Sequence, residues 1–219
     1  LGDDDFVMYL GDNLLRQGIA EFVERFEDDR HRSAALTLDE ATVAPSAQIL
    51  LARVSDPQRF GVAEIGADGE VVRLVEKPEE PPSDLALVGV YLFDPSIHEA
   101  VASIEASPRG ELEITDAIQW LIDHGHRVRH EVLDGWWKDT GKLQPLLEGN
   151  RLILETIELD IRGSVDADSI IDGRVVIEEG AEIVNSTVRG PAIIGERTRV
   201  VNSYIGPFTS VYFDCEVVD

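Results

Sequence analysis

A six-residue periodicity in the last third of the chain constrains the fold more than any other feature of the sequence. Aliphatic side chains recur at every sixth position, with a slip of one residue after Ile183 and another after Val200. The series consists of Val165, Ile171, Ile177, Ile183, Val188, Ile194, Val200, Ile205, Val211 and Val217. Small or medium-sized residues follow most of these positions by four, and Tyr204 is the exception. Such hexads are typical of a parallel β-helix, in which each face of a triangular prism directs one aliphatic side chain inward. An ordinary β-meander is the alternative.

Residues 1–157 alternate between strand-like and helix-like patterns. Alternating or continuous apolar runs predict strands at residues 6–10, 34–38, 48–54, 85–93 and 130–133. Residues 60–65 and 71–76 flank an Asp-Gly turn and predict a hairpin. Apolar residues at helical spacing predict helices over residues 14–26, 96–104, 113–124 and 141–157, the first of them capped by the turn at Asp12 and Asn13. The first part of the chain is therefore predicted to be α/β, with residues 158–219 forming the β-helix.

The charge of the chain limits its partners. With 43 acidic and 19 basic side chains, its formal net charge is −24, so its surface repels nucleic acids, and a phosphorylated ligand needs local cations or a metal ion. The longest apolar run, residues 85–93, is far shorter than the ~20 residues that span a bilayer, and no signal-peptide pattern opens the sequence. The single cysteine, Cys215, excludes an intrachain disulfide and suits the cytoplasm. We expect a cytoplasmic protein with small-molecule partners, without nucleic-acid or membrane binding.

Two aspartates follow predicted strands at positions far apart in the chain. Asp12 follows the first strand, and Asp139 follows Trp137-Lys138 at a strand-to-helix corner. Open α/β sheets bind ligands at the carboxyl ends of their strands, and Mg²⁺ prefers hard oxygen ligands. The pair could therefore hold Mg²⁺, although an aspartate at a helix start is also a common cap.

A second group of polar residues could recognise a phosphorylated sugar. Glu76 and Lys77 leave a strand end side by side, so that one could accept hydrogen bonds from sugar hydroxyls and the other could hold a phosphate. A solvated Glu-Lys turn is the alternative. Tyr91 and Arg109 are either ligand contacts or ordinary strand and loop residues.

Six motifs occur in the order found in the sugar nucleotidyltransferases. They are Leu10-Gly11-Asp12-Asn13, Phe60-Gly61-Val62-Ala63-Glu64, Val75-Glu76-Lys77-Pro78, Val88-Gly89-Val90-Tyr91, the segment from Arg109 to Asp116, and Trp137-Lys138-Asp139-Thr140-Gly141. The chain resembles this family, and within it the long form of the glucose-1-phosphate thymidylyltransferases. The resemblance implies a partial Rossmann-like nucleotidyltransferase domain with a mixed sheet at residues 1–157. It also implies a left-handed parallel β-helix at residues 158–219.

The resemblance also implies an activity and a set of site residues. The reaction would be the transfer of a thymidylyl group from dTTP to glucose 1-phosphate, giving dTDP-glucose and pyrophosphate. Asp12 and Asp139 would hold Mg²⁺ and, with Lys77, serve catalysis. The substrate contacts would be Asn13, Gly61, Glu76 and Val88 to the glucose, Lys77 and Arg109 to its phosphate, and Tyr91 and Trp137 in the pocket wall.

One departure from the family bears on these expectations. The glycine-rich nucleotide loop that precedes the Asp-bearing strand in the family is missing from this sequence, and the β-helix stops in mid-repeat. We therefore expect a central fragment of a longer enzyme that is inactive by itself and whose base specificity cannot be read. Alternatives are a relative that uses another nucleotide or sugar phosphate, and a non-catalytic homologue that binds nucleotide sugars. An acyltransferase β-helix would need a catalytic histidine, and residues 158–219 contain none. We expect the β-helix to support a homo-oligomer.

Overall fold

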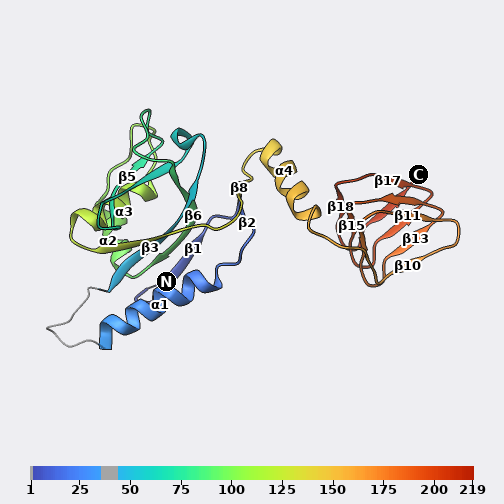
Figure 1. Ribbon diagram of the computed structural model, residues 1–219, viewed down its shortest axis with the longest axis horizontal. Helices are drawn as coiled ribbons and strands as arrows, with labels where there is room; N and C mark the ends of the chain where they lie inside the picture. The colour runs from blue at the N-terminus through green and yellow to red at the C-terminus, as the bar shows by residue number, and fades with distance from the viewer. Residues whose placement is uncertain (1, 36–43) are drawn as a thin grey trace. The chain divides into compact units, whose positions relative to one another are not determined.

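The computed structural model describes residues 2–35 and 44–219, and it divides into two compact units (Figure 1). The units comprise Leu1–Asp139 and Thr140–Asp219. The contacts place the helix after Asp139 with the second unit, whereas the period of the sequence changes only after residue 157. No helix formed by the described residues is both long and apolar enough to cross a membrane.

The first unit is built on a six-stranded mixed sheet with the order β5-β4-β6-β3-β7, to which β1 is added through β6. Its strands are β1 (Phe6–Tyr9), β3 (Pro45–Arg53), β4 (Gly61–Ile65), β5 (Val71–Glu76), β6 (Leu85–Phe93) and β7 (Arg127–Val132). Strand β3 runs parallel to β7 and antiparallel to β6. The other edge of β6 pairs with β4 at Ala86 and with β1 from Val90 to Phe93. The predicted mixed sheet, its buried strands and the β4–β5 hairpin are confirmed.

Helices cover both faces of this sheet because its central strands carry apolar side chains on both sides. The helices are α1 (Ala20–Ala35), α2 (Ser96–Ser103) and α3 (Ile114–Asp123), with a short 3₁₀ helix η1 (Pro57–Arg59) before β4. One core packs α2 and α3 against residues such as Ile49, Tyr91 and Phe93. The other packs α1 against Leu50 and Val88. Figure 1 shows α1 on the opposite side of the sheet from α2 and α3.

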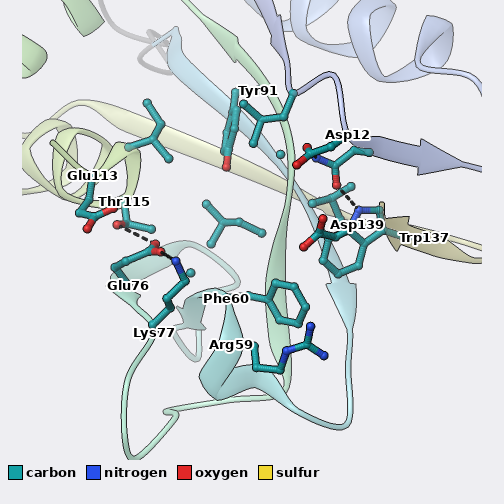
Figure 2. Close-up of a pocket in the computed structure, with 17 residues that line it drawn as sticks. Asp12, Arg59, Phe60, Glu76, Lys77, Tyr91, Glu113, Thr115, Trp137 and Asp139 are labelled. Carbon is teal, nitrogen blue, oxygen red and sulfur yellow. Dashed lines mark hydrogen bonds and ion pairs between the residues drawn. The ribbon is translucent and has the colours of Figure 1, made fainter. Parts of the chain in front are cut away.

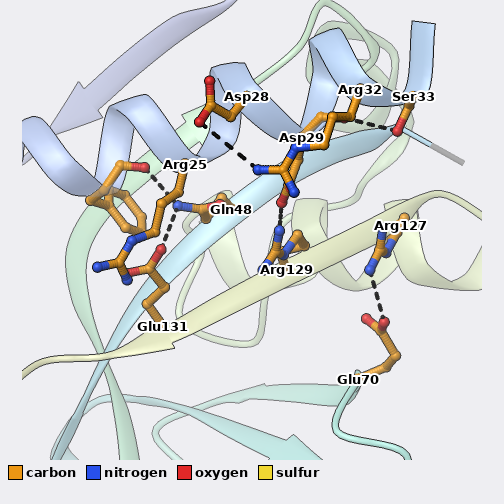
Figure 3. A network of polar contacts seen from close by, with 11 residues as sticks. Arg25, Asp28, Asp29, Arg32, Ser33, Gln48, Glu70, Arg127, Arg129 and Glu131 are labelled. Carbon is orange, nitrogen blue, oxygen red and sulfur yellow. Dashed lines mark hydrogen bonds and ion pairs between the residues drawn. The ribbon is translucent and has the colours of Figure 1, made fainter. Parts of the chain in front are cut away.

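Helix α1 is fixed to the sheet by a polar network as well as by its apolar face (Figure 3). Gln48, which is fully buried, donates its amide Nε2 to the carbonyl of Phe22 at 2.8 Å and to Glu131 Oε1 at 3.3 Å. Arg25 Nη1 lies 2.8 Å from Glu131 Oε2. Burial raises the pKa of the Glu131 carboxyl, and the charge of Arg25 opposes that rise. The network therefore contains one carboxylate whose charged form the fold disfavours.

Two predictions for the N-terminal part of the chain are wrong. Residues 13–15 do not start a helix: Asn13–Leu15 forms strand β2, which pairs antiparallel with β8 (Trp137–Asp139), and α1 begins only at Ala20. The apolar spacing from residue 14 onward therefore belongs partly to a strand whose partner is far away in the sequence. The strand predicted at residues 34–38 is also not formed at its start, because Ala34 and Ala35 end α1, and residues 36–38 lie outside the described residues.

The second unit consists of helix α4 (Leu143–Leu154) and a parallel β-solenoid. The solenoid strands are β9 (Asp160–Ile161), β10 (Ser164–Val165), β11 (Ile170–Asp172), β12 (Val175–Ile177), β13 (Glu182–Val184), β14 (Thr187–Arg189), β15 (Ala192–Ile194), β16 (Arg199–Val201), β17 (Tyr204–Ile205), β18 (Thr209–Val211) and β19 (Glu216–Val218). They form three sheets with the orders β10-β13-β16-β19, β11-β14-β17 and β18-β15-β12-β9. The predicted parallel solenoid is confirmed.

The register of the solenoid explains the two slips in the sequence period. Val175 pairs with Ala192, and Ala192 pairs with Thr209, so that each of these coils takes 17 residues. A coil thus contains two hexads and one segment shortened by one residue. The inward aliphatic residues of the middle coils are buried, as Ile183 and Val200 illustrate. The hexad spacing therefore arises because each face of a coil contributes one aliphatic side chain to the core.

Candidate active site

Nine of the ten predicted site residues line one cavity of about 220 Å³ in the first unit (Figure 2). They are Asp12, Asn13, Gly61, Glu76, Lys77, Val88, Tyr91, Trp137 and Asp139. The cavity lies where β1 turns into β2, where β4 begins and β5 ends, along β6, at the start of α3 and at β8. Segments from most of the length of the unit therefore meet at this point.

The pairing of β2 with β8 brings the two predicted metal-binding aspartates to the same cavity. Asn13 lies opposite Asp139 in the register of these strands, and Asp12 directly precedes Asn13. Trp137 donates its indole Nε1 hydrogen to Asn13 Oδ1, and Asn13 Nδ2 in turn donates to Asp12 Oδ1 at 3.1 Å. The turn that carries Asp12 is also tied to β6, because Leu10 N donates to the carbonyl of Gly89 at 2.9 Å. A hydrogen-bonded chain from β8 thus orients the Asp12 carboxylate.

The side chains around Asp12 and Asp139 restrict the kind of metal site that this end of the cavity can form. Among the described residues, no group of three or more His, Cys, Asp or Glu side chains is placed to hold a metal ion. Asp12 and Asp139 both line the cavity and supply hard oxygen atoms. Mg²⁺ is usually bound by one or two carboxylates, with substrate phosphates and water completing the octahedron. The donor set therefore fits Mg²⁺ in the presence of a phosphorylated substrate, and not an all-protein cage.

Two glycines shape the cavity because a larger residue would collide with its walls. A Cβ atom at Gly61 would lie 2.6 Å from Thr115 Cγ2, which is a contact that real structures do not tolerate. Gly89 adopts φ +82°, and a Cβ atom there would lie 2.8 Å from Asn13 Nδ2. Glycine at 89 therefore allows β6 to approach the turn that carries Asp12.

The opposite end of the cavity is built around Glu76. Lys77 Nζ lies 3.2 Å from Glu76 Oε1, and Thr115 Oγ1 donates to Glu76 Oε2 at 3.4 Å. Lys77 adopts a left-handed backbone conformation with φ 42°, and its N–H donates to the carbonyl of Phe60 at 3.0 Å. The end of the hairpin thus presents a carboxylate and an ammonium group to the cavity side by side.

Arg109, the tenth predicted residue, does not line this cavity. Its guanidinium contacts three carboxylates: Nη1 lies 3.1 Å from Glu113 Oε1 and 3.4 Å from Glu76 Oε1, and Nη2 lies 3.0 Å from Glu111 Oε2. Glu76 and Glu113 themselves line the cavity. Arg109 is therefore placed directly behind two cavity residues, with its charge engaged by glutamates.

Tyr91 presents a neutral phenol to the cavity. Its side chain is almost fully buried in β6, and its ring stacks on Phe93 with a centroid distance of 5.7 Å. Burial, followed by the negative charge of Glu76, raises the pKa of the Tyr91 phenol above its ordinary value. The hydroxyl group therefore keeps its proton at physiological pH and can donate a hydrogen bond.

Sequence reasoning missed four polar or aromatic residues of the cavity wall: Arg59, Phe60, Glu113 and Thr115. Glu113 and Thr115 belong to the segment that carried the resemblance, and their position at the start of α3 was the signal that could have selected them. Phe60 opens the motif that continues with Gly61, and this motif could have selected it. Arg59 lies just before the motif, and no periodic pattern singles it out.

The chain is similar to known nucleotidyltransferases. A family model described as nucleotidyl transferase matches residues 1–156. A glucose-1-phosphate thymidylyltransferase of Streptomyces griseus is 54% identical over 219 residues, which is 100% of this chain and 58% of the relative. A low-salt glycan biosynthesis nucleotidyltransferase of Haloferax volcanii is 45% identical over 213 residues, covering 96% of this chain and 56% of the relative.

A solved structure shares the fold. It comes from Bacillus anthracis, is described as a complex with sucrose, and has a provisional assignment as a glucose-1-phosphate thymidylyltransferase. It superposes with a TM-score of 0.58 at 34% identity and covers 73% of this chain and 58% of the solved chain. The present chain thus spans somewhat more than half the length of the relatives that it matches. It belongs to the nucleotidyl transferase family.

Proposed function

We propose that the protein containing this chain transfers a thymidylyl group from dTTP to glucose 1-phosphate. The observation that carries the proposal is the meeting of Asp12 and Asp139 with Glu76 and Lys77 around one cavity. The high identity to proteins named glucose-1-phosphate thymidylyltransferases supports the choice of substrates. In the reaction, a phosphate oxygen of glucose 1-phosphate forms a bond to the α-phosphorus of dTTP, the bond from that phosphorus to the β-phosphate oxygen breaks, and pyrophosphate leaves.

The sugar lies between Glu76 and Asn13 in this proposal. The Glu76 carboxylate accepts hydrogen bonds from glucose hydroxyls, and the side chain of Asn13 contacts the same sugar. Gly61 and Val88 provide a close, uncharged surface for the ring. Tyr91 donates a hydrogen bond from its neutral phenol, and Trp137 forms the adjoining wall.

The sugar phosphate is held by Lys77 and Arg109. Lys77 already lies in the cavity, and its ammonium group exchanges part of its contact with Glu76 for the phosphate. Arg109 reaches the phosphate only when its guanidinium releases one of its glutamate partners. The network that engages Arg109 therefore competes with the substrate for the same donors.

Asp12 and Asp139 hold Mg²⁺ in the proposed complex. When bound, the ion neutralises negative charge on the phosphates of the reacting group. The protein itself supplies orientation: Asn13 and Trp137 hold the Asp12 carboxylate in place. Positioning and charge neutralisation are the main sources of rate enhancement in such a transfer.

Release of pyrophosphate from dTTP in the presence of glucose 1-phosphate tests the proposal in the whole protein that contains these residues. We expect turnover with this pair, and a Lys77→Ala variant with a KM for glucose 1-phosphate raised roughly ten- to a hundredfold, because a charge-assisted hydrogen bond is lost. Lys142→Ala, outside the cavity, is the matched control and leaves KM unchanged. A preference for UTP would show that the base is uracil and not thymine. Binding of a nucleotide sugar without turnover would show that the protein is a non-catalytic binder. Light scattering of the same preparation tests the expected homo-oligomer.

A further inference from the structure

The cavity carries more negative than positive side chains, although its proposed substrates are themselves negatively charged. Among its described lining residues, four carboxylates face two cations, Arg59 and Lys77. Two phosphorylated substrates add further negative charge in the proposed reaction. Lys77 lies beside Glu76 and is assigned to the sugar phosphate. Arg59 is the remaining lining cation, and neither the motifs nor the resemblance gives it a role.

Arg59 belongs to the other side of the cavity. Its guanidinium carbon lies 5.4 Å from the centroid of the Phe60 ring, and that ring packs edge-on against Trp137 at 5.0 Å. Trp137 is two residues before Asp139 on β8. Figure 2 shows Arg59 next to Phe60 on the side of Trp137 and Asp139, with Lys77 across the cavity beside Glu76. The two cations therefore serve different ends of the same space.

The guanidinium is held in place while it keeps donors for a ligand. Asp56 Oδ2 lies 2.7 Å from Arg59 Nη1, and η1 connects the two residues. The Arg59 side chain is 50% exposed. A guanidinium carries five N–H donors in a rigid plane that matches the oxygens of a phosphate, so the contact with Asp56 leaves others available. Asp56 and Phe60 already restrict the Arg59 side chain, so phosphate binding loses less conformational entropy.

We propose that Arg59 binds a phosphoryl group of the nucleotide substrate, across the cavity from Lys77 and the sugar phosphate. The inference rests on the proposed nucleotidyl transfer and adds to it a phosphate-binding residue. The nucleotide is favoured over the sugar phosphate because Arg59 lies on the side of Asp139, where the nucleotide phosphates meet the carboxylate pair. A planar fork also suits a phosphoryl group that must be oriented for in-line attack.

The chain offers a matched control for this residue. Arg53 contacts Asp84 through Nη1 at 2.7 Å, as Arg59 contacts Asp56, and its side chain is 67% exposed. Arg53 does not line the cavity. Arg59→Ala and Arg53→Ala each remove one positive charge and one exposed ion pair. Any effect of overall charge or of surface stability is therefore common to both variants.

The experiment is steady-state kinetics of the whole protein, with the KM for dTTP and for glucose 1-phosphate measured separately. Arg59→Ala is expected to raise the KM for dTTP roughly ten- to a hundredfold and to leave that for glucose 1-phosphate within about twofold. Arg59→Lys, which keeps the charge without the fork, recovers part of the loss. Arg53→Ala leaves both constants at the wild-type values.

The outcomes separate this inference from the proposed function. A wild-type protein without turnover refutes the nucleotidyl transfer and, with it, the role of Arg59. Wild-type turnover with Arg59→Ala indistinguishable from Arg53→Ala refutes the role of Arg59 alone. A rise confined to the KM for glucose 1-phosphate also overturns it, since the cation would then serve the sugar phosphate. Arg59→Gln, which preserves most of the side-chain volume, gives the same comparison if the alanine variant does not fold.

Discussion

The hydrogen bond from Trp137 to Asn13 makes a sharp test of how the cavity is organised. The Trp137 indole donates to Asn13 Oδ1, and Asn13 is only 7% exposed. Trp137→Phe keeps an aromatic ring against Phe60 but removes the donor, so it leaves a buried amide oxygen without its partner. The expected loss of stability is about 1–3 kcal/mol, which is the cost of an unsatisfied buried polar group.

The same substitution should also lower the catalytic rate, because it disturbs the position of Asp12. Asn13 Nδ2 donates to Asp12 Oδ1 at 3.1 Å, so an amide released by Trp137 no longer orients that carboxylate. A displacement of about 1 Å at a reacting centre can cost up to roughly a hundredfold in rate. We expect kcat in the whole protein to fall by roughly ten- to a hundredfold.

Urea unfolding and pyrophosphate release measure the two effects. Trp136→Phe is the matched control, because it removes an indole from the neighbouring position, which does not line the cavity. The midpoint of unfolding should shift for Trp137→Phe with little change in slope, since the surface exposed on unfolding is nearly the same. Equal unfolding midpoints and equal turnover for the two phenylalanine variants would refute the orienting chain.

Three further substitutions test other parts of the structure. Gly61→Ala places a Cβ atom 2.6 Å from Thr115 Cγ2 and should destabilise the first unit by about 1–3 kcal/mol in urea unfolding, whereas Gly18→Ala, with no atom within 4 Å, should be near neutral. Glu131→Gln should match or exceed the wild-type stability at pH 8, because burial raises the pKa of that carboxyl above its ordinary value of 4.5. The destabilising charge develops as the pH rises through the folded pKa, so the advantage should disappear at pH 4, and an advantage that grows there would contradict the reasoning. Ser186→Ala removes the hydroxyl oxygen that accepts a backbone N–H of the next coil at 3.0 Å, and should lower the unfolding free energy of the solenoid by about 1–3 kcal/mol.

The solenoid was predictable because its signal is local and repeated. Every coil buries the same kind of side chain at the same place, so ten aliphatic positions report one architecture. Even the slips after Ile183 and Val200 have a structural meaning, namely a coil of 17 residues. Buried strands such as β6 were equally visible, since nine consecutive residues are apolar or glycine and all nine are buried.

Strand β2 could not be predicted, because its three residues acquire their conformation from a distant partner. Nothing near Asn13 reports that residues 137–139 will pair with it, and its leucines also fit a helical spacing. Asp12 nevertheless lines the cavity, because it lies in the turn between β1 and β2.

The site residues at the ends of strands could be predicted from the sequence, whereas the contacts made by loop residues could not. Asp12, Glu76 and Asp139 were found by their position at the ends of strands. The contact of Arg59 with Asp56 depends on how a short segment folds back on itself. Arg109 meets Glu111 and Glu113 in the same way, whereas its contact with Glu76 joins two distant parts of the sequence. Such contacts leave no periodic trace in the sequence.

Binding of Mn²⁺, as a paramagnetic substitute for Mg²⁺, is the most direct test of the central proposal that Asp12 and Asp139 share one cation. Water-proton relaxation of the whole protein is titrated for the wild type, Asp12→Asn, Asp139→Asn and the control Asp134→Asn, whose side chain does not line the cavity. We predict that each of the first two variants weakens Mn²⁺ binding at least tenfold while the control binds like the wild type. Equal affinity in all four proteins would contradict the account.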